Sequence, residues 1–283
     1  MIAPRVMGIV NVTPDSFSDG GLYADAERAV AHGRQLLIDG ADVIDVGGES
    51  TRPGATRPLV HEELDRVIPV ITALAAQGAV ISIDTMRASV ASAALAAGAR
   101  IVNDVSGGLA DPEMLSVVAA SDATYVAMHW RAHAATMADF TDYGPHGVVE
   151  GVRRELGERL EAIAAAGVDP ERVILDPGLG FAKTPAHNWE LLAGLGALVE
   201  LGHPLLVGAS RKSFLGQVLA DDGQPRGVGE REFAHAALVA LLAERGVAYL
   251  RVHDVRATRD ALAVVGALAA AGVSGGVRHA GLS

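Results

Sequence analysis

The chain has 283 residues, of which 50% are hydrophobic and 20% are charged, so it can bury a large core in one large domain or two modest ones. Its formal net charge of −11 argues against a general nucleic-acid binder, because the overall field repels polyanions. The absence of cysteine excludes disulfides, cysteine-ligated zinc, iron–sulfur clusters and thiol nucleophiles. No window is apolar enough for a membrane span and no targeting segment is visible, so we expect a cytoplasmic protein.

Eight short apolar runs, each followed by polar residues, predict eight strands along the chain. They lie within residues 7–11, 39–50, 77–85, 97–106, 123–129, 166–178, 201–210 and 245–254. Six of these segments carry a glycine that can close the preceding helix in a left-handed conformation, namely Gly40, Gly78, Gly98, Gly167, Gly202 and Gly246. The segments between the strands have apolar residues at helical spacing, and Asp25 is a candidate cap for the first helix.

This alternation of strands and helices predicts a parallel sheet covered by helices. Eight units in a chain of this length favour a (β/α)₈ TIM barrel in a single domain over residues 1–273, with a frayed tail at 274–283. An open doubly wound sheet is the structural alternative. Residues 131–150 form the longest connection without a clear pattern.

Three fragments imitate known motifs but lack an essential residue. GLGFAKT resembles a phosphate-binding P-loop but has Ala182 where that motif requires glycine before the lysine. GASRK lacks the second glycine of a nucleophile elbow, and HWRAH has Trp130 where a zincin carries glutamate. We therefore expect neither a serine nucleophile nor a zinc site here.

The polar residues that follow the predicted strands are the candidates for function. They are Asn11, Asp45, Asp84, Asn103, Asp104, His129, Asp176, Ser210, Lys212, Arg251, His253 and Asp254. Any one of them alone is more simply explained as a helix cap or a turn residue. In both folds, however, the ends of the strands meet at one ligand-binding edge, and this mixture of carboxylates, amides and cations suits hydrogen-bond recognition of a flat polar heterocycle.

A second subsite is predicted from the last strand. Arg251 and His253 are two residues apart, so their side chains should point to the same side, and with Asn11 across the barrel they could hold a phosphate-like group. A salt-bridged strand end is an almost equally good explanation for RVHD taken alone. We expect Arg211, unlike Lys212, to point outward.

Seven motifs together resemble the dihydropteroate synthase family, in order and at compatible spacing, over about residues 6–270. They are NVTPDSFSDGG, DVGGESTRPGA, SIDTMR, NDVSGG, LDPGLGFAK, GASRKSFLG and RVHD. The resemblance implies a TIM barrel, usually a homodimer, that joins 6-hydroxymethyl-7,8-dihydropterin diphosphate to p-aminobenzoate. The products are 7,8-dihydropteroate and pyrophosphate, and the reaction belongs to folate biosynthesis.

The resemblance also implies roles for individual residues, grouped by what they would contact. Asp84, Asn103, Asp176, Lys212 and Arg251 would hold the pterin, and Asn11 would ligate Mg²⁺ on the diphosphate, whose oxygens would contact Arg52, Arg251 and His253. The p-aminobenzoate subsite would comprise Phe17, Thr51, Arg52, Pro53, Phe181, Lys212 and Ser213. The residues with catalytic roles would be Asn11, Asp19, Lys212, Arg251 and His253, in a dissociative substitution of the SN1 type.

Two alternative functions remain open from the sequence. One is a non-catalytic paralogue that binds a pterin, although NVTPDSFSDGG and ESTRPG are both intact. The other is a methyltetrahydrofolate-dependent methyltransferase domain, which would need neither the diphosphate contacts nor the GASRKS segment. The expected partners are the two small-molecule substrates and a second copy of the chain, with no nucleic acid and no membrane.

Overall fold

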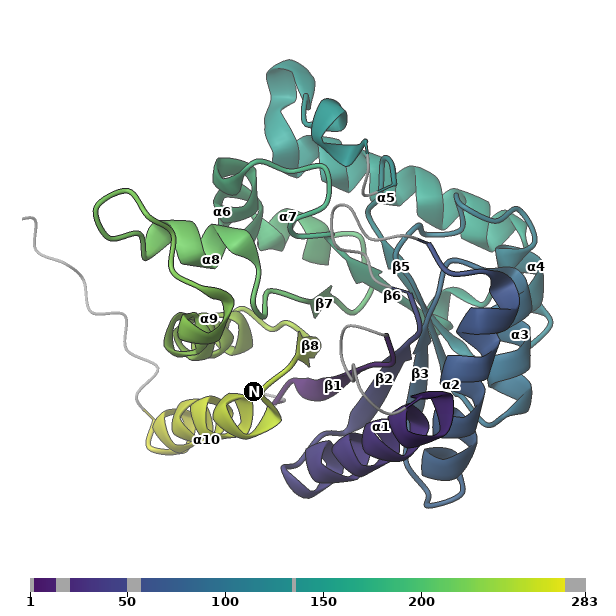
Figure 1. The fold of residues 1–283 in the computed structure, drawn as a ribbon. Helices are drawn as coiled ribbons and strands as arrows, with labels where there is room; N and C mark the ends of the chain where they lie inside the picture. Colours follow the sequence, from purple (N-terminus) through teal and green to yellow (C-terminus); the bar gives the residue numbers. More distant parts are fainter. Residues whose placement is uncertain (1–2, 14–20, 50–56, 134–135, 273–283) are drawn as a thin grey trace, which may run out of the picture.

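The computed structural model describes residues 3–13, 21–49, 57–133 and 136–272, in which eight parallel strands form a barrel (Figure 1). The strands are β1 (Arg5–Asn11), β2 (Val43–Gly47), β3 (Ile81–Asp84), β4 (Ile101–Asp104), β5 (Thr124–Met128), β6 (Val173–Asp176), β7 (Leu206–Val207) and β8 (Tyr249–Val252). They are ordered β6-β5-β4-β3-β2-β1-β8-β7. A parallel bridge between Leu175 and Leu205 joins the two outer strands of this order and closes the ring. The prediction of a TIM barrel is confirmed, and the open doubly wound alternative is wrong.

Helices surround the ring of strands (Figure 1). They are α1 (Gly21–Ile38), α2 (Val60–Ala75), α3 (Ala88–Ala96), α4 (Met114–Ala119), α5 (Gly147–Ala165), α6 (Pro185–Ala193), α7 (Leu195–Val199), α8 (Ser213–Val218), α9 (Glu232–Glu244) and α10 (Val255–Ala270). Short 3₁₀ turns occur at η2 (Met137–Phe140), η3 (Gly144–His146), η4 (Pro170–Arg172) and η5 (Val228–Glu230). Across the described ranges, no helix is long and apolar enough to cross a bilayer.

The glycine signals located the helix ends correctly. All six predicted glycines have a positive φ, between 76° at Gly246 and 110° at Gly98. An L side chain rarely adopts this conformation, so each glycine ends a helix and lets the chain turn back into the barrel. The predicted cap at Asp25 is wrong, because α1 begins at Gly21 and Asp25 lies inside it, 3.9 Å from Arg28.

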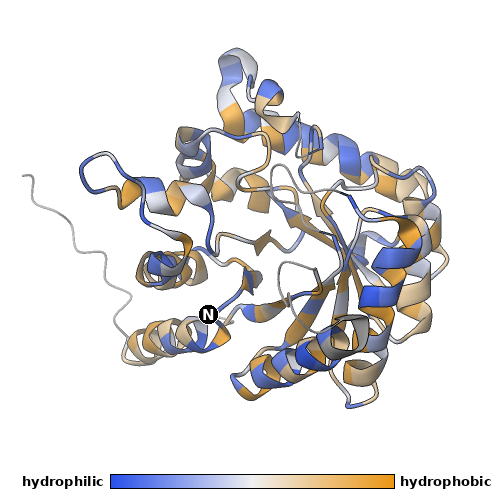
Figure 2. Ribbon diagram, viewed as in Figure 1, coloured by the Kyte–Doolittle hydropathy of each residue, from blue (hydrophilic) through white to orange (hydrophobic). Residues whose placement is uncertain are grey.

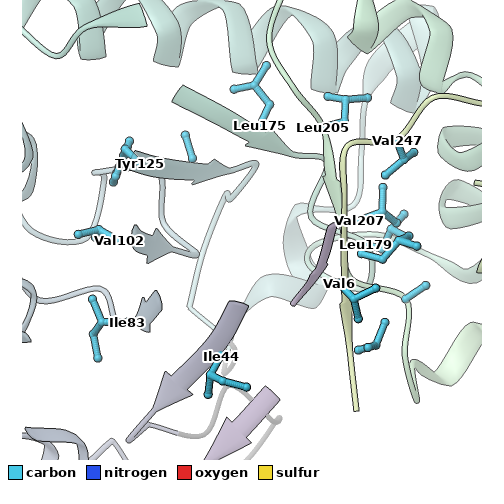
Figure 3. Packing of buried hydrophobic residues seen from close by; sticks show 14 of the residues in the cluster. Val6, Ile44, Ile83, Val102, Tyr125, Leu175, Leu179, Leu205, Val207 and Val247 are labelled. Carbon is cyan, nitrogen blue, oxygen red and sulfur yellow. The ribbon is translucent and has the colours of Figure 1, made fainter. Parts of the chain in front are cut away.

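Two apolar clusters pack on the two faces of the ring of strands. Side chains that point outward from the strands pack against the helices in one large buried cluster, and Figure 3 shows Ile44, Ile83, Val102 and Tyr125 of this cluster on successive strands. Inward-pointing side chains form a smaller cluster made of Met7, Val43, Ile101, Val126, Ile174 and Leu206. The hydropathy pattern agrees, with largely apolar strands and polar segments recurring along the surrounding helices (Figure 2). The inner cluster closes the interior of the barrel below the strand ends.

Candidate active site

A pocket lies at the carboxyl ends of the strands, and all five predicted pterin-binding residues line it. Its walls consist of Asp84, Asn103, Asp176, Lys212 and Arg251 together with Val105, Met128, Leu179, Phe181 and Gly208. Three acidic or amide side chains, two cations and an apolar wall therefore face one another. The predicted convergence of these residues from distant parts of the chain is confirmed.

Strand periodicity explains why these side chains meet. Asn103 follows Ile101 by two positions and Asp176 follows Ile174 by two, and both isoleucines belong to the inner apolar cluster. Because side chains alternate between the two faces of a strand, the residue two positions further on also points inward, one layer higher. Asp104 has the opposite orientation, and its buried carboxylate accepts hydrogen bonds from Ser106 and from the Tyr125 hydroxyl on the outer side.

Arg251 connects three strands across the pocket floor. Its Nε donates to Asp45 Oδ2 at 2.6 Å, and its Nη2 donates to Asp84 Oδ2 at 2.5 Å. Asn103 Nδ2 also donates to Asp45 Oδ2, at 3.2 Å. Burial disfavours the guanidinium charge, but the two carboxylates, with Asp45 the stronger, outweigh burial and raise the pKa of Arg251. A salt bridge at RVHD is thus present, and it belongs to the pocket itself.

The two carboxyls that line the pocket, those of Asp84 and Asp176, have raised pKa values. Burial raises the pKa of Asp84 to about 7 against the opposing charge of Arg251. Burial also raises the pKa of Asp176 to about 6, while the hydrogen bond from the backbone N–H of Gly178, at 2.7 Å, acts in the opposite direction. Burial therefore outweighs the neighbouring positive charges and donors, and both carboxyls have a pKa above the ordinary value of an aspartate.

Lys212 stands between the polar and the apolar walls. Burial lowers the pKa of its ammonium group to about 8, and the attraction of Asp176 opposes this shift. Its Nζ lies 4.3 Å from the centre of the Phe181 ring, within the range of a cation–π contact. The neighbouring Arg211 is exposed, as expected, and its backbone φ is 62°. The left-handed backbone at Arg211 lets two adjacent cations take different directions.

Asn11 and His253 lie at the ends of neighbouring strands. The prediction that Asn11 lies across the barrel from Arg251 is wrong, because β1 pairs directly with β8. Closing a barrel brings its first and last strands together, so the two residues share one side of the mouth. His253 is half-buried, and its Nδ1 lies 3.0 Å from Ser210 Oγ.

The remaining predicted residues fall into two groups. Ser213 is the exposed first residue of α8 and does not line the pocket. Phe17, Asp19, Thr51, Arg52 and Pro53 lie outside the described residues, as does the tail at 274–283.

The donor set is compatible with Mg²⁺ held mainly by its substrate. Within the ranges that the structure describes, there is no group of three or more His, Asp or Glu side chains that could hold a metal. The half-buried Asn11 ends β1 and offers an amide oxygen, a hard ligand of the kind Mg²⁺ prefers. Mg²⁺ commonly keeps several waters and binds through one or two protein ligands plus substrate phosphates, so one amide fits such a site.

Sequence reasoning gave no role to Asp45, although it noted this residue at a strand end. Asp45 is fully buried, accepts hydrogen bonds from Arg251 and Asn103, and has no hydrogen-bond partner for its Oδ1 among the described residues. The available signal was its position two residues after Val43, which predicts an inward side chain. The pocket walls Val105, Met128 and Leu179 carried no comparable signal, because apolar residues are common throughout the chain.

Comparisons with known proteins agree with this site. The model of the pterin binding enzyme family matches residues 7–253. A dihydropteroate synthase of Mycobacterium leprae (strain TN) is 53% identical over 274 residues, which cover 96% of each chain. A structure of dihydropteroate synthase from Xanthomonas albilineans with 4-aminobenzoic acid has a TM-score of 0.87 at 48% identity, covering 95% of this chain and 94% of the other. A second structure of that enzyme, in complex with 7,8-dihydropteroate, has a TM-score of 0.83 at 46% identity with the same coverage. The chain belongs to the dihydropteroate synthase family and is a transferase of folate biosynthesis.

Proposed function

We propose that this pocket binds 6-hydroxymethyl-7,8-dihydropterin diphosphate and that p-aminobenzoate displaces the diphosphate at the mouth of the barrel. The observation that carries this proposal is the pocket itself, in which Asp84, Asn103, Asp176 and Lys212 face one cavity. A pterin is a flat heterocycle with an amino-pyrimidine edge, so carboxylates accept its N–H groups and a lysine donates to its carbonyl. We assign ring recognition to these four residues, with Arg251 beside them.

The diphosphate end of the substrate is assigned to the neighbouring strand ends. Asn11 would hold Mg²⁺, and His253, Arg251 and Arg52 would contact the diphosphate oxygens. When bound, Mg²⁺ neutralises the negative charge that grows on the departing diphosphate. Asn11 ends β1 and His253 directly follows the adjacent β8, which supports one shared subsite for the metal and the anion.

The reaction follows a dissociative path in this proposal. The bond between the pterin methylene carbon and the diphosphate oxygen breaks with its electron pair on the oxygen, and the electron-rich dihydropterin ring stabilises the cation. The amine nitrogen of p-aminobenzoate then bonds to that carbon and loses one proton. A neutral aromatic amine is already nucleophilic, so no strong general base is needed, and Asp19 is the proposed proton acceptor or cation-positioning residue.

We assign the p-aminobenzoate subsite to Phe181, Lys212 and Ser213, together with Phe17, Thr51, Arg52 and Pro53. The contact between the Phe181 ring and Lys212 supports this part of the proposal, because it forms an aromatic wall beside a cation that can face a carboxylate.

The direct test is an assay of pyrophosphate release with the pterin diphosphate, p-aminobenzoate and Mg²⁺. We expect release that requires all three components and that yields 7,8-dihydropteroate. Folded protein that releases no pyrophosphate above an enzyme-free control would instead support a non-catalytic paralogue.

We further propose that two copies of the chain associate through α9 and α10, in the cytoplasm. These adjacent helices expose Phe233 (93%), Leu241 (51%), Val264 (61%) and Leu268 (50%). An exposed apolar face of this kind suits an isologous contact between two copies. Sedimentation analysis should find a dimer for the wild-type chain and a shift towards monomer for Phe233→Glu, whereas a wild-type monomer would overturn the proposal.

A further inference from the structure

Lysine is rare in this chain, and its two occurrences are both close to the pocket. Of the 23 lysine and arginine residues, only Lys183 and Lys212 are lysines. The other 21 residues of that total are arginines. Lysine differs from arginine by its compact head group, its flexible stem and its ability to lose a proton when buried. Lys212 lines the pocket, whereas the function proposed above leaves Lys183 without a role.

Lys183 is buried behind the pocket wall and directs its amine to two acceptors. Only 9% of the residue is exposed. Its Nζ lies 2.9 Å from His129 Nδ1 and 3.0 Å from the backbone carbonyl oxygen of Phe181. Burial lowers the pKa of the Lys183 amine to about 7. Protonated or neutral, the amine has enough N–H groups to serve both acceptors.

A half-buried ion pair between Arg131 and Glu155 fixes the direction of these hydrogen bonds. Glu155 accepts from Arg131 through both oxygens, at 2.9 and 2.6 Å, and its Oε2 lies 2.9 Å from His129 Nε2. Burial acts against the Glu155 charge, but His129 and Arg131 overcome it and lower the carboxyl pKa to about 2. Because the carboxylate can only accept, His129 Nε2 carries the proton, and burial with the nearby Lys183 charge lowers the His129 pKa to about 4. His129 Nδ1 is therefore the acceptor and Lys183 the donor.

A second contact holds the next residue of the same loop. The Tyr143 hydroxyl donates to the carbonyl oxygen of Ala182 at 3.1 Å. Ala182 has a φ of 48°, in the left-handed region that an L side chain seldom adopts. The Arg131 guanidinium carbon lies 3.8 Å from the centre of the Tyr143 ring, so the ion pair that orients His129 also supports Tyr143. Lys183 and Tyr143, which both contact the group formed by His129, Glu155 and Arg131, thus bind two consecutive carbonyl oxygens, those of Phe181 and Ala182.

We propose that Lys183 is a positioning residue for p-aminobenzoate, and that it acts by holding the carbonyl of Phe181 so that the Phe181 ring stays against Lys212. This inference rests on the proposed function, which assigns Phe181 and Lys212 to the p-aminobenzoate subsite. The geometry supports it, because the Phe181 ring is 4.3 Å from Lys212 Nζ while the backbone of the same residue is bound to Lys183. Arg131 and Tyr143, from the segment without a sequence pattern, gain a role in the same network.

A double-mutant cycle distinguishes this role from simple support of the fold. Lys183→Met keeps the length of the stem and removes the donors, and Phe181→Ala removes the ring through which Lys183 is proposed to act. Loss of a hydrogen bond from a charged group corresponds to about a tenfold effect, so Lys183→Met should raise the KM for p-aminobenzoate about tenfold. The KM for the pterin diphosphate should change by about twofold or less, because the four pterin-facing residues are untouched. In the Phe181→Ala background, Lys183→Met should leave the KM for p-aminobenzoate unchanged.

The proposal would be overturned if the double variant raised the KM for p-aminobenzoate by the product of the two single-variant factors. It would also be overturned if Lys183→Met had the wild-type KM for p-aminobenzoate. If Lys183→Met does not fold, Tyr143→Phe carries the same cycle, with about a threefold rise expected from loss of one neutral hydrogen bond. Tyr249→Phe is the matched control, because Tyr249 lies at the amino-terminal start of β8, away from the pocket. Tyr249→Phe should leave the KM for p-aminobenzoate unchanged. A Tyr143→Phe variant that also leaves this KM unchanged would contradict the proposal.

An activity-independent measurement separates this inference from the proposed reaction. The amides of Gly178, Gly180 and Phe181 are all hydrogen-bonded within the loop or to its neighbours. Hydrogen exchange of a peptide that covers residues 178–184 should therefore be at least about threefold faster in Lys183→Met or Tyr143→Phe than in the wild type. Unchanged exchange would overturn the proposed hold on the loop even if the wild-type chain were inactive in the pyrophosphate assay. An inactive wild-type chain with faster exchange in the variants would instead reject the proposed function and the role assigned toward p-aminobenzoate.

Discussion

Arg251 shows how a single side chain organises the pocket floor. Its hydrogen bonds to Asp45 and Asp84 bring β8 together with β2 and β3, and Asn103 of β4 joins through Asp45. A buried ion pair of this kind gains little stability over an apolar replacement, because both charges lose their hydration. Its value here is geometric, since it fixes a carboxylate of the ring-binding set at a defined place. Asp45 is thereby a positioning residue for Arg251.

The adjacent residues Arg211 and Lys212 provide a matched pair for a substitution test. Lys212 faces the pocket beside Asp176, whereas Arg211 is exposed. We expect Lys212→Ala to lower kcat/KM for the pterin diphosphate at least about a hundredfold, because it removes a half-buried charged donor worth about 3 kcal/mol. Arg211→Ala should change it by less than about threefold. Equal losses in steady-state kinetics would contradict the assignment of Lys212.

The shifted pKa values predict a bell-shaped pH dependence. The ring N–H groups need carboxylate acceptors, so kcat/KM should fall as the pH decreases through the pKa values of Asp84, about 7, and Asp176, about 6. It should fall again above about pH 8, where Lys212 loses its proton. Lys212→Arg keeps the positive charge and should remove the basic limb. A basic limb that persists in this variant, or constant kcat/KM down to pH 5, would contradict these roles.

The strand ends were the part of the fold that could be predicted best from the sequence. Each strand appears as an apolar run that ends in polar residues, and the six closing glycines mark where the preceding helices stop. The five polar wall residues followed from that pattern because parallel strands in a barrel end at one mouth. Asn11 was misplaced because the prediction treated distance along the chain as distance across the barrel. The network of Glu155, His129 and Lys183 was missed because its members belong to different elements and share no motif.

Gly178 links the element that carries Asp176 to the loop that carries Phe181. Its φ is 69°, and a Cβ at this position would lie 2.3 Å from the carbonyl oxygen of His129. Gly167 has a φ of 87°, and no atom of the described residues lies within 4 Å of the place where a Cβ would stand. Gly167→Ala therefore measures the cost of the backbone conformation alone. We expect Gly167→Ala to lower the free energy of unfolding by about 1 kcal/mol and Gly178→Ala by at least about 2 kcal/mol more.

Denaturant unfolding of the two glycine variants measures this difference. Gly178→Ala should also raise the KM for both substrates, because the shift of the backbone displaces Asp176 and Phe181 together. Equal losses of stability in the two variants would show that the close approach to His129 has no energetic weight.

The barrel as a whole separates stability from chemistry along its axis. The inner apolar cluster and the helix-facing cluster make up the closed body, while the titratable side chains gather one layer higher, at the carboxyl ends. This division agrees with the proposed binding of an anionic substrate by a chain of net charge −11, since Arg251 and Lys212 bring positive charge to the pocket at the carboxyl ends of the strands.

The most direct test of this account is a crystal structure of the chain with 6-hydroxymethylpterin diphosphate and Mg²⁺. We predict that the amino-pyrimidine edge of the ring contacts Asp176 and Asn103, that Lys212 donates to the ring, and that the diphosphate lies beside Asn11 and His253. A ring bound outside the cavity between Asp84 and Lys212, or a diphosphate on the opposite side of the mouth from β1 and β8, would contradict it.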